Sequence, residues 1–120
     1  MKLYKRSDFL DLPAGTIYSR VDPQSGGLMT GLFCKDSGPD YGNDWLEQDL
    51  IGECGFPAGI KDGLTAIEYV ENLRDTFQDF ETDLYCPGRD GCFDEDDLFV
   101  VWSKADVRKL ISRLVNAISL

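Results

Sequence analysis

Two stretches in the second half of the chain repeat apolar residues at the spacing of a helix. The first stripe consists of Ile67, Val70, Leu73 and Phe77. This spacing is the three-or-four-residue period of an amphipathic helix. Thr65 followed by Glu68 has the spacing of a capping box, which predicts that Thr65 is the N-cap. We expect the stripe to be buried.

The second helix is predicted by the same signals near the end of the chain. Ser103 and Asp106 are spaced as a capping box. The apolar stripe that follows consists of Val107, Leu110, Ile111, Leu114 and Ile118. The basic residues of this segment fall mainly off the stripe, so the apolar side is again expected to face the core.

Short runs of β-branched and aromatic residues predict strands at 16–21, 28–35, 45–51, 82–85 and 98–102. The turn residues of 22–27 join the first two runs into a hairpin. The last run is apolar almost throughout, which predicts a central strand covered on both faces. A single helical turn is expected at 7–12 before Pro13.

These elements predict an α+β fold: an antiparallel or mixed sheet of four to five strands, with the two helices of the C-terminal half packed on it. The chain has 120 residues, which is a common size for one domain. We therefore expect residues 1–120 to form a single domain.

The charge is concentrated in the middle of the chain. The total is −10, but residues 36–100 carry 18 acidic and three basic groups, while both ends are mildly basic. This charge disfavours direct binding to nucleic acid or to an anionic membrane. It favours a basic protein partner.

The first residues lack the apolar core of a signal peptide, and no apolar run approaches the length of a membrane span. We therefore expect a cytoplasmic protein, in the host cell if the chain is phage-encoded. Cys34, Cys54, Cys86 and Cys92 are accordingly expected to be free thiols. The spacing of Cys86 and Cys92 is wider than zinc knuckles prefer.

An acidic segment at 88–97 is the densest chemical feature. Its carboxylates are Asp90, Asp94, Glu95, Asp96 and Asp97. With Gly91 at the sixth position of an EF-hand loop, Cys86 and Gly88 occupy positions that need carboxylates, so this motif is excluded. A solvated acidic turn is favoured over an irregular Ca²⁺ or Mg²⁺ site, and neither metal nor cofactor is expected.

A second candidate surface is the loop that holds Tyr41, Asn43, Asp44 and Trp45. Tyr and Trp give large contact areas at low entropic cost, so such loops often bind partners. The alternative is that Trp45 belongs to the core. Arg89 could hold a phosphate or carboxylate of a ligand, although an internal ion pair with an acidic neighbour is favoured.

No residue or motif in this sequence clearly indicates catalysis. The chain has no His, which removes the usual general base near neutral pH. Walker, dinucleotide and nucleophile-elbow motifs are absent from the sequence. The carboxylate pairs are too numerous for spacing to select an acid and a base. No catalytic residue is predicted, and an enzyme is not expected.

The chain contains three distinctive stretches: YKRSDFL leading to LPAGT, then NDWLEQDLI, then GRDGCFD before the final strand and helix. Together they resemble small uncharacterised proteins of bacteriophages and prophages. The group carries no activity that can be transferred to particular residues. The resemblance implies a compact accessory protein of the kind that binds and blocks a host factor or a defence component.

The leading hypothesis is thus a small acidic binding protein of phage or prophage type that inhibits a basic host or defence protein. The alternatives are capture of a small nucleotide ligand, with phosphates held by Arg6, Arg20, Arg89 or Arg108, and a metal-dependent enzyme centred on 90–97. A homodimer is possible. The candidate binding residues are Tyr41, Asn43, Asp44, Trp45, Arg89, Asp90, Asp94, Glu95 and Asp96.

Overall fold

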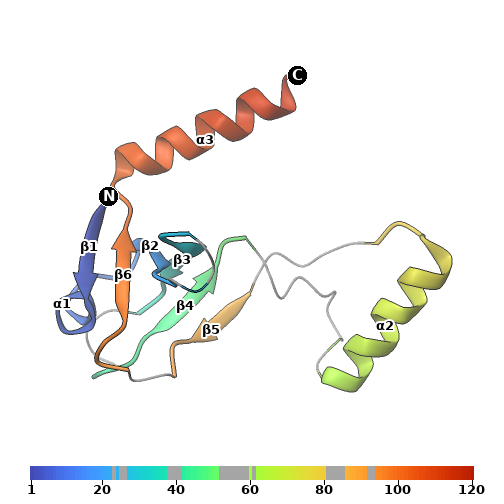
Figure 1. Ribbon diagram of the computed structural model, residues 1–120, viewed down its shortest axis with the longest axis horizontal. Coiled ribbons are helices and arrows are strands. Elements are labelled where there is room, and N and C mark those ends of the chain that lie inside the picture. The colour runs from blue at the N-terminus through green and yellow to red at the C-terminus, as the bar shows by residue number, and fades with distance from the viewer. Residues whose placement is uncertain are drawn as a thin grey trace.

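The computed structural model describes residues 1–22, 24, 27–37, 42–51, 60, 62–80, 86–91 and 94–120. This part of the chain forms six strands and three helices (Figure 1). In chain order they are β1 (Lys2–Lys5), α1 (Arg6–Leu10), β2 (Ile17–Arg20), β3 (Thr30–Lys35), β4 (Leu46–Asp49), α2 (Gly63–Thr76), β5 (Pro87–Arg89), β6 (Leu98–Val101) and α3 (Lys104–Ile118).

The strands form one antiparallel sheet in the order β1-β6-β2-β3-β4-β5. The α+β class is confirmed, but the predicted strand number of four to five is too low. The two strands that the sequence pattern misses, β1 and β5, are the edges of the sheet. Both are short, and β5 begins with a proline, which edge strands tolerate. The strand predicted at 82–85 lies outside the described residues.

The central position of the apolar run is confirmed. Strand β6 lies between β1 and β2, and Phe99 and Val100, which point to opposite faces, are both buried. The hairpin of β2 and β3 is also confirmed, with Tyr18 opposite Phe33 and an irregular register beyond it.

The core of the described residues is a small aromatic cluster of Phe9, Tyr18, Trp45 and Phe99. Phe9 belongs to α1, and its ring stacks on the ring of Phe99 with 4.3 Å between the two centroids. Lys35 holds the end of this helix, because its buried amino group donates hydrogen bonds to the carbonyls of Phe9, Leu10 and Leu12.

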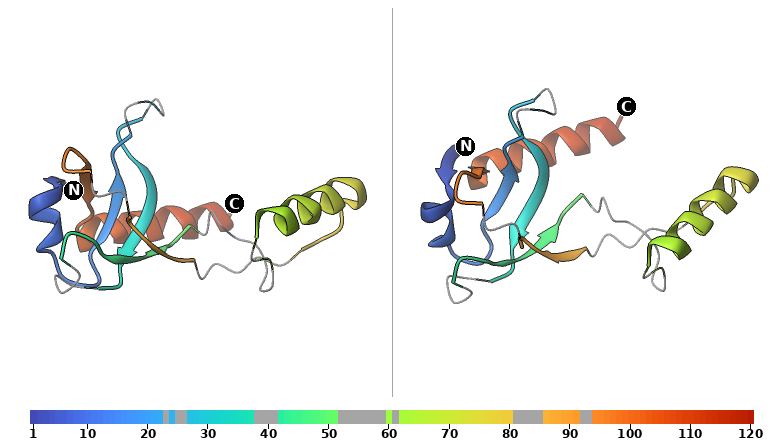
Figure 2. Two further views of the ribbon diagram at one scale, coloured as in Figure 1. Left: turned by 90° about the horizontal axis from the view of Figure 1, so that it is seen from below. Right: turned by 60° about the horizontal axis from the view of Figure 1, so that its bottom comes forward.

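The prediction that the two long helices pack on the sheet is wrong. Neither α2 nor α3 contains a buried residue, and Phe77 and Ile118 are 87% and 84% exposed. Figures 1 and 2 show α3 extending away from β6 and α2 standing apart from the sheet. The reason is that the sheet residues pack on one another and on α1, which closes the core without the long helices.

Of the two predicted helix N-caps, one is confirmed and one is wrong. The capping box of Ser103 and Asp106 is confirmed at the start of α3. The N-cap of α2 is Asp62, whose carboxylate accepts from the Thr65 N–H, rather than Thr65 itself. Asp is an equally good N-cap, and its position three residues earlier lengthens the helix by one turn.

The prediction of free thiols is wrong for Cys86, which is disulfide-bonded. Cys54 and Cys92 lie outside the described residues. Cys34 is a free thiol. None of the helices among the described residues has the length and apolar content of a bilayer crossing.

Candidate functional site

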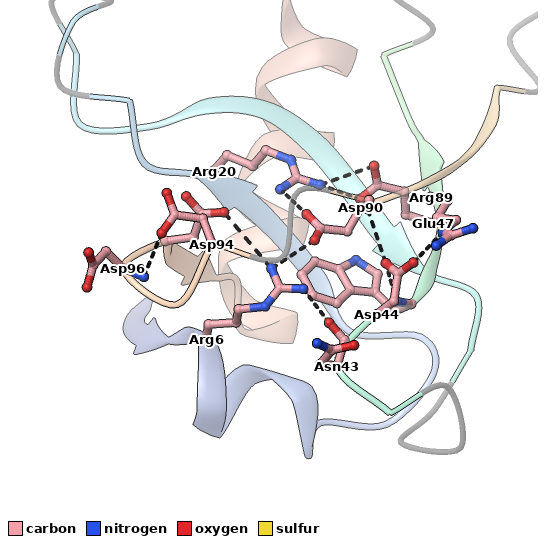
Figure 3. A network of polar contacts seen from close by, with 12 residues as sticks. Arg6, Arg20, Asn43, Asp44, Glu47, Arg89, Asp90, Asp94 and Asp96 are labelled. Carbon is pink, nitrogen blue, oxygen red and sulfur yellow. Dashed lines mark hydrogen bonds and ion pairs between the residues drawn. The ribbon is translucent and has the colours of Figure 1, made fainter.

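A chain of charged side chains lies directly against the aromatic core (Figure 3). Its centre is Arg20 at the end of β2, which donates to both carboxylate oxygens of Glu47, at 2.9 and 3.2 Å, and to Asp90 at 2.9 Å. The Arg20 guanidinium also lies 5.3 Å from the centroid of the Phe33 ring. Burial opposes the charged form, but the nearby carboxylate of Glu47 raises the pKa of Arg20 above its usual value. Arg20 is therefore a permanent cation that holds two strands and a turn together.

A second guanidinium approaches Asp90 from the other side. Arg6, the first residue of α1, places its Nη1 2.8 Å from Asp90 Oδ2, and its Nη2 donates to the Asn43 carbonyl. The carboxylate of Asp90 is fully buried between the two arginines. Removing either partner would leave a charge without compensation in the interior.

The phenol of Tyr18 extends the polar chain into the core. It donates to Glu47 and accepts from the indole N–H of Trp45 at 2.8 Å. Burial, and then the Glu47 carboxylate, raise the pKa of Tyr18 well above its usual range. Tyr18 therefore stays protonated, and its hydroxyl group satisfies two buried partners at once.

The internal ion pair expected for Arg89 is confirmed, with Asp44 as the acceptor. The Asp44 carboxylate also accepts from the backbone N–H groups of Trp45 and Gly91, at 2.9 and 3.2 Å. Burial alone would raise the pKa of Asp44, but these N–H groups and the Arg89 guanidinium lower it overall. This cluster fastens β4 to the turn after β5.

The structure divides the remaining predicted binding residues into buried and exposed ones. Trp45 is completely buried, so its core alternative is the correct one, and Asp90 is an internal ion-pair partner. Asn43, Asp94, Glu95 and Asp96 are exposed. The Asp94 carboxylate accepts from the Asp96 N–H, which forms a local turn. Tyr41 lies outside the described residues.

A cavity of about 440 Å³ opens beside Arg20 and Glu47. Its lining combines the apolar residues Phe33 and Leu98 with the carboxylate-bearing residues Asp90 and Asp97. Asp97 is only partly buried, and it lies 4.0 Å from Arg6, which is already paired with Asp90.

The carboxylate of Asp97 is in excess over the cations around it. Burial, and then the negative charges of Asp94 and Asp90, raise the pKa of Asp97, while Arg20 and Arg6 offset this only in part. The cavity therefore has a negative potential and apolar walls. Such a site suits an organic cation, because rings and alkyl groups contact its stem while the carboxylates attract its charge.

The described residues contain no group of three or more potential metal ligands. Within the same residues, Glu47 and Asp90 already accept hydrogen bonds from arginine. The arrangement is suited to holding the fold together.

The network residues Tyr18, Arg20 and Glu47 are absent from the predicted binding set. For Arg6 and Arg20, the sequence predicts only a role as ligands for a nucleotide phosphate. The signal that could have found them is strand alternation, since Tyr18 and Arg20 lie on the same face of a predicted strand. Alternation does not reveal which acidic residue pairs with each arginine.

Comparison of the chain with protein-family models, curated proteins and solved structures finds no match.

Proposed function

We propose that this chain is a non-enzymatic binding protein that recognises a basic protein partner, and that the cavity beside Arg20 and Asp97 receives a Lys or Arg side chain. The observation that supports this is the excess carboxylate of Asp97 on an apolar-walled cavity. An incoming cation would pair with Asp97, and its alkyl stem would lie against Phe33 and the exposed Leu98.

The acidic middle of the chain supplies the long-range part of recognition. Its net charge would attract a basic surface and raise the association rate, and the effect would weaken as salt increases. The exposed carboxylates of the 94–96 turn belong to this general field. The cavity supplies the specific contact, because there the charge is partly desolvated.

The inhibition of a host or defence protein, which the phage resemblance implies, is the biological form of the same proposal and stays a prediction. The nucleotide alternative loses three of its four candidate arginines, because Arg6, Arg20 and Arg89 each pair with a carboxylate, and it keeps only Arg108. The metal-dependent enzyme has no favouring observation among the described residues.

The test measures binding of the full chain to an array of synthetic peptides with Arg or Lys in an otherwise neutral sequence, beside the same peptides with Gln. We expect basic peptides to bind, with affinity that falls as salt rises. Asp97→Asn should weaken binding about tenfold, which corresponds to about 1.4 kcal/mol.

The matched control is Asp96→Asn, which removes the same charge from the adjacent residue outside the cavity lining. We expect a change of less than about twofold, as is usual for an exposed charge. Equal losses for Asp96→Asn and Asp97→Asn would show diffuse attraction and refute the cavity assignment. Equal binding of the Arg and Gln peptides would refute the proposed function.

A further inference from the structure

A cavity of about 500 Å³ lies where the end of β6 leads into α3. Residues 13–17 and the first turns of α3 contribute to its lining, together with Val101 and Trp102. The cavity of the proposed function is lined by Asp97 and Leu98, at the start of β6. The two cavities therefore lie at opposite ends of this strand. A volume of this size is typical of sites for small molecules.

The charges that line this cavity have one sign. Among the described residues, the lining includes Lys104 and Arg108 but no Asp or Glu, although the chain has 22 acidic and only 12 basic residues. Asp106 lies in the same turn of α3, but its carboxylate is already paired with the N-terminal amine at 2.7 Å and accepts from the Ser103 hydroxyl. The cavity is therefore a positive site in a mostly negative chain.

These two cations are not used by the fold. In the described part of the chain, Lys104 and Arg108 form no ion pair, whereas Arg6, Arg20 and Arg89 each do. Lys104 is the first residue of α3, where the helix dipole disfavours a cation. Arg108 follows one turn later, and side chains at this spacing are neighbours on a helix. An anion bound between the two would relieve both the repulsion and the dipole effect.

The rest of the lining is mostly apolar. Ile17 of β2, Val101 of β6 and Val107 of α3 contribute aliphatic side chains. The indole N–H of Trp102 donates to the Ser19 hydroxyl at 3.0 Å, so its one polar group is satisfied and its ring adds apolar surface. A bare inorganic anion would leave this surface in contact with water. The cavity therefore suits an anion that also carries an apolar body.

We propose that this cavity binds a small organic anion, whose charged group pairs with Lys104 and Arg108 and whose ring-containing apolar body lies against Trp102 and Val107. The charged group contributes attraction and orientation, and burial of the apolar body contributes the remaining affinity. This proposal does not depend on the proposed function, because the two cavities share no lining residue and take ligands of opposite charge.

Two other occupants are less well supported. An extended acidic peptide would need free backbone groups along the cavity. The backbone N–H groups of Gly15, Thr16 and Trp102 each donate to a carbonyl of this chain already. An anionic membrane surface is opposed by the net charge of −10, and a flat surface would not fill a cavity.

The experiment titrates the full chain with 2-naphthoate, and separately with 2-naphthamide, which has the same rings without the charge. Binding is followed by the backbone amide resonances in ¹H–¹⁵N NMR spectra. We expect 2-naphthoate to shift the resonances of residues 14–17 and 101–108, and to bind about tenfold more tightly than the amide. Lys104→Gln and Arg108→Gln should each weaken binding of 2-naphthoate about threefold to fivefold, as expected for exposed ion pairs.

Two kinds of control make the test specific. Lys109→Gln and Arg113→Gln remove the same charge from α3 outside the cavity lining, and each should change the affinity for 2-naphthoate by less than about twofold. Ala14→Phe places a ring in the cavity from an exposed position without changing the charge, and it should abolish binding. The spectra of the unliganded variants report whether each remains folded.

Three results would overturn the proposal. Equal affinities for 2-naphthoate and 2-naphthamide would show that the cations play no part. Equal losses for Arg108→Gln and Lys109→Gln would show attraction to the whole helix rather than a site in the cavity. Absence of shifts at residues 14–17 with 2-naphthoate, together with shifts there on addition of an acidic amphipathic peptide, would refute a small-molecule site in favour of a protein partner.

Discussion

The core under the sheet buries charged side chains, whereas the two long helices expose apolar ones. Lys35 is 1% exposed in the core, whereas Ile118 of α3 is 84% exposed. In the core, aromatic rings surround charged groups whose hydrogen bonds are supplied by β2, β4 and α1. In the helices, most of each regular apolar stripe is exposed among the described residues. Helical periodicity therefore indicates which face of a helix is apolar and suited to packing, but it does not indicate which segment or molecule packs on that face.

The largest effect that would test this contrast is the loss of the Asp90 carboxylate. Asp90→Ala leaves Arg6 and Arg20 in the interior without their shared acceptor. We expect a loss of about 3–5 kcal/mol in the free energy of unfolding, as for other broken buried pairs. Urea denaturation at neutral pH measures it.

The matched substitution in the helical region is Ile118→Ala. Because Ile118 is mostly exposed, it should change stability by less than about 0.5 kcal/mol. The contrast is reversed from the usual order, in which loss of a large apolar residue costs more than loss of a carboxylate. A larger cost for Ile118→Ala than for Asp90→Ala would overturn it.

The next effect concerns the hydroxyl group that joins the rings to the charges. Tyr18→Phe keeps the ring but removes the acceptor of the Trp45 indole N–H and one donor to Glu47. Leaving buried polar groups unsatisfied should cost about 2 kcal/mol. The control is Tyr4→Phe, whose ring lies at the margin of the core, and which should be nearly neutral. Equal costs for the two would show that the Tyr18 hydroxyl is not specifically required.

The sequence predicts the sheet interior better than its edges. The β6 run and the β2–β3 hairpin are found because apolar content and turn residues both mark them. Strand β1 is missed because its Lys-Leu-Tyr-Lys pattern looks like a polar N-terminus. Strand β5 owes its conformation to pairing with β4, a long-range contact that a three-residue Pro-Gly-Arg segment does not encode by itself.

The candidate site is predictable in its residue types but not in its pairings. An acidic stretch with few cations correctly indicates that Arg89 pairs internally. Asp90 is buried because it pairs with Arg6, which lies 84 positions before it in the chain, and with Arg20. Asp94, by contrast, is exposed. Charge composition does not contain this information, because it arises only when α1, β2 and the turn after β5 are brought together.

A smaller effect should appear in the pH dependence of the stability that the Asp44 carboxylate contributes. Since the pKa of Asp44 is lowered in the folded protein, the unfolded chain takes up a proton first as pH falls below about 4. The stabilisation by Asp44 is therefore complete at neutral pH and is lost with acidification. Asp44→Asn should cost about 1 kcal/mol at pH 7, since Arg89 is well exposed, and less at pH 3.

The measurement is urea unfolding of the wild-type protein and Asp44→Asn at a series of pH values between 3 and 7. The difference between the two curves should shrink as pH falls. A difference that stays constant would mean that the Asp44–Arg89 pair contributes no pH-dependent stability. Asp36→Asn, an exposed carboxylate near β3, serves as the control.

The smallest stability effect has the opposite sign and separates binding from folding. The pKa of Asp97 is raised in the folded protein, so the folded state holds its proton more strongly and loses stability as pH rises through this range. Asp97→Asn removes the repulsion and should raise stability at pH 7, by no more than about 0.5 kcal/mol because the side chain is partly exposed. The same substitution should weaken binding of the basic peptides. If Asp97 served only the fold, its replacement would destabilise the protein. A gain in the stability of the protein together with a loss of peptide binding would indicate that the charge is maintained for a partner. If Asp97→Asn destabilises the protein and leaves peptide binding unchanged, Asp97 belongs to the ionic core and the cavity is not a recognition site.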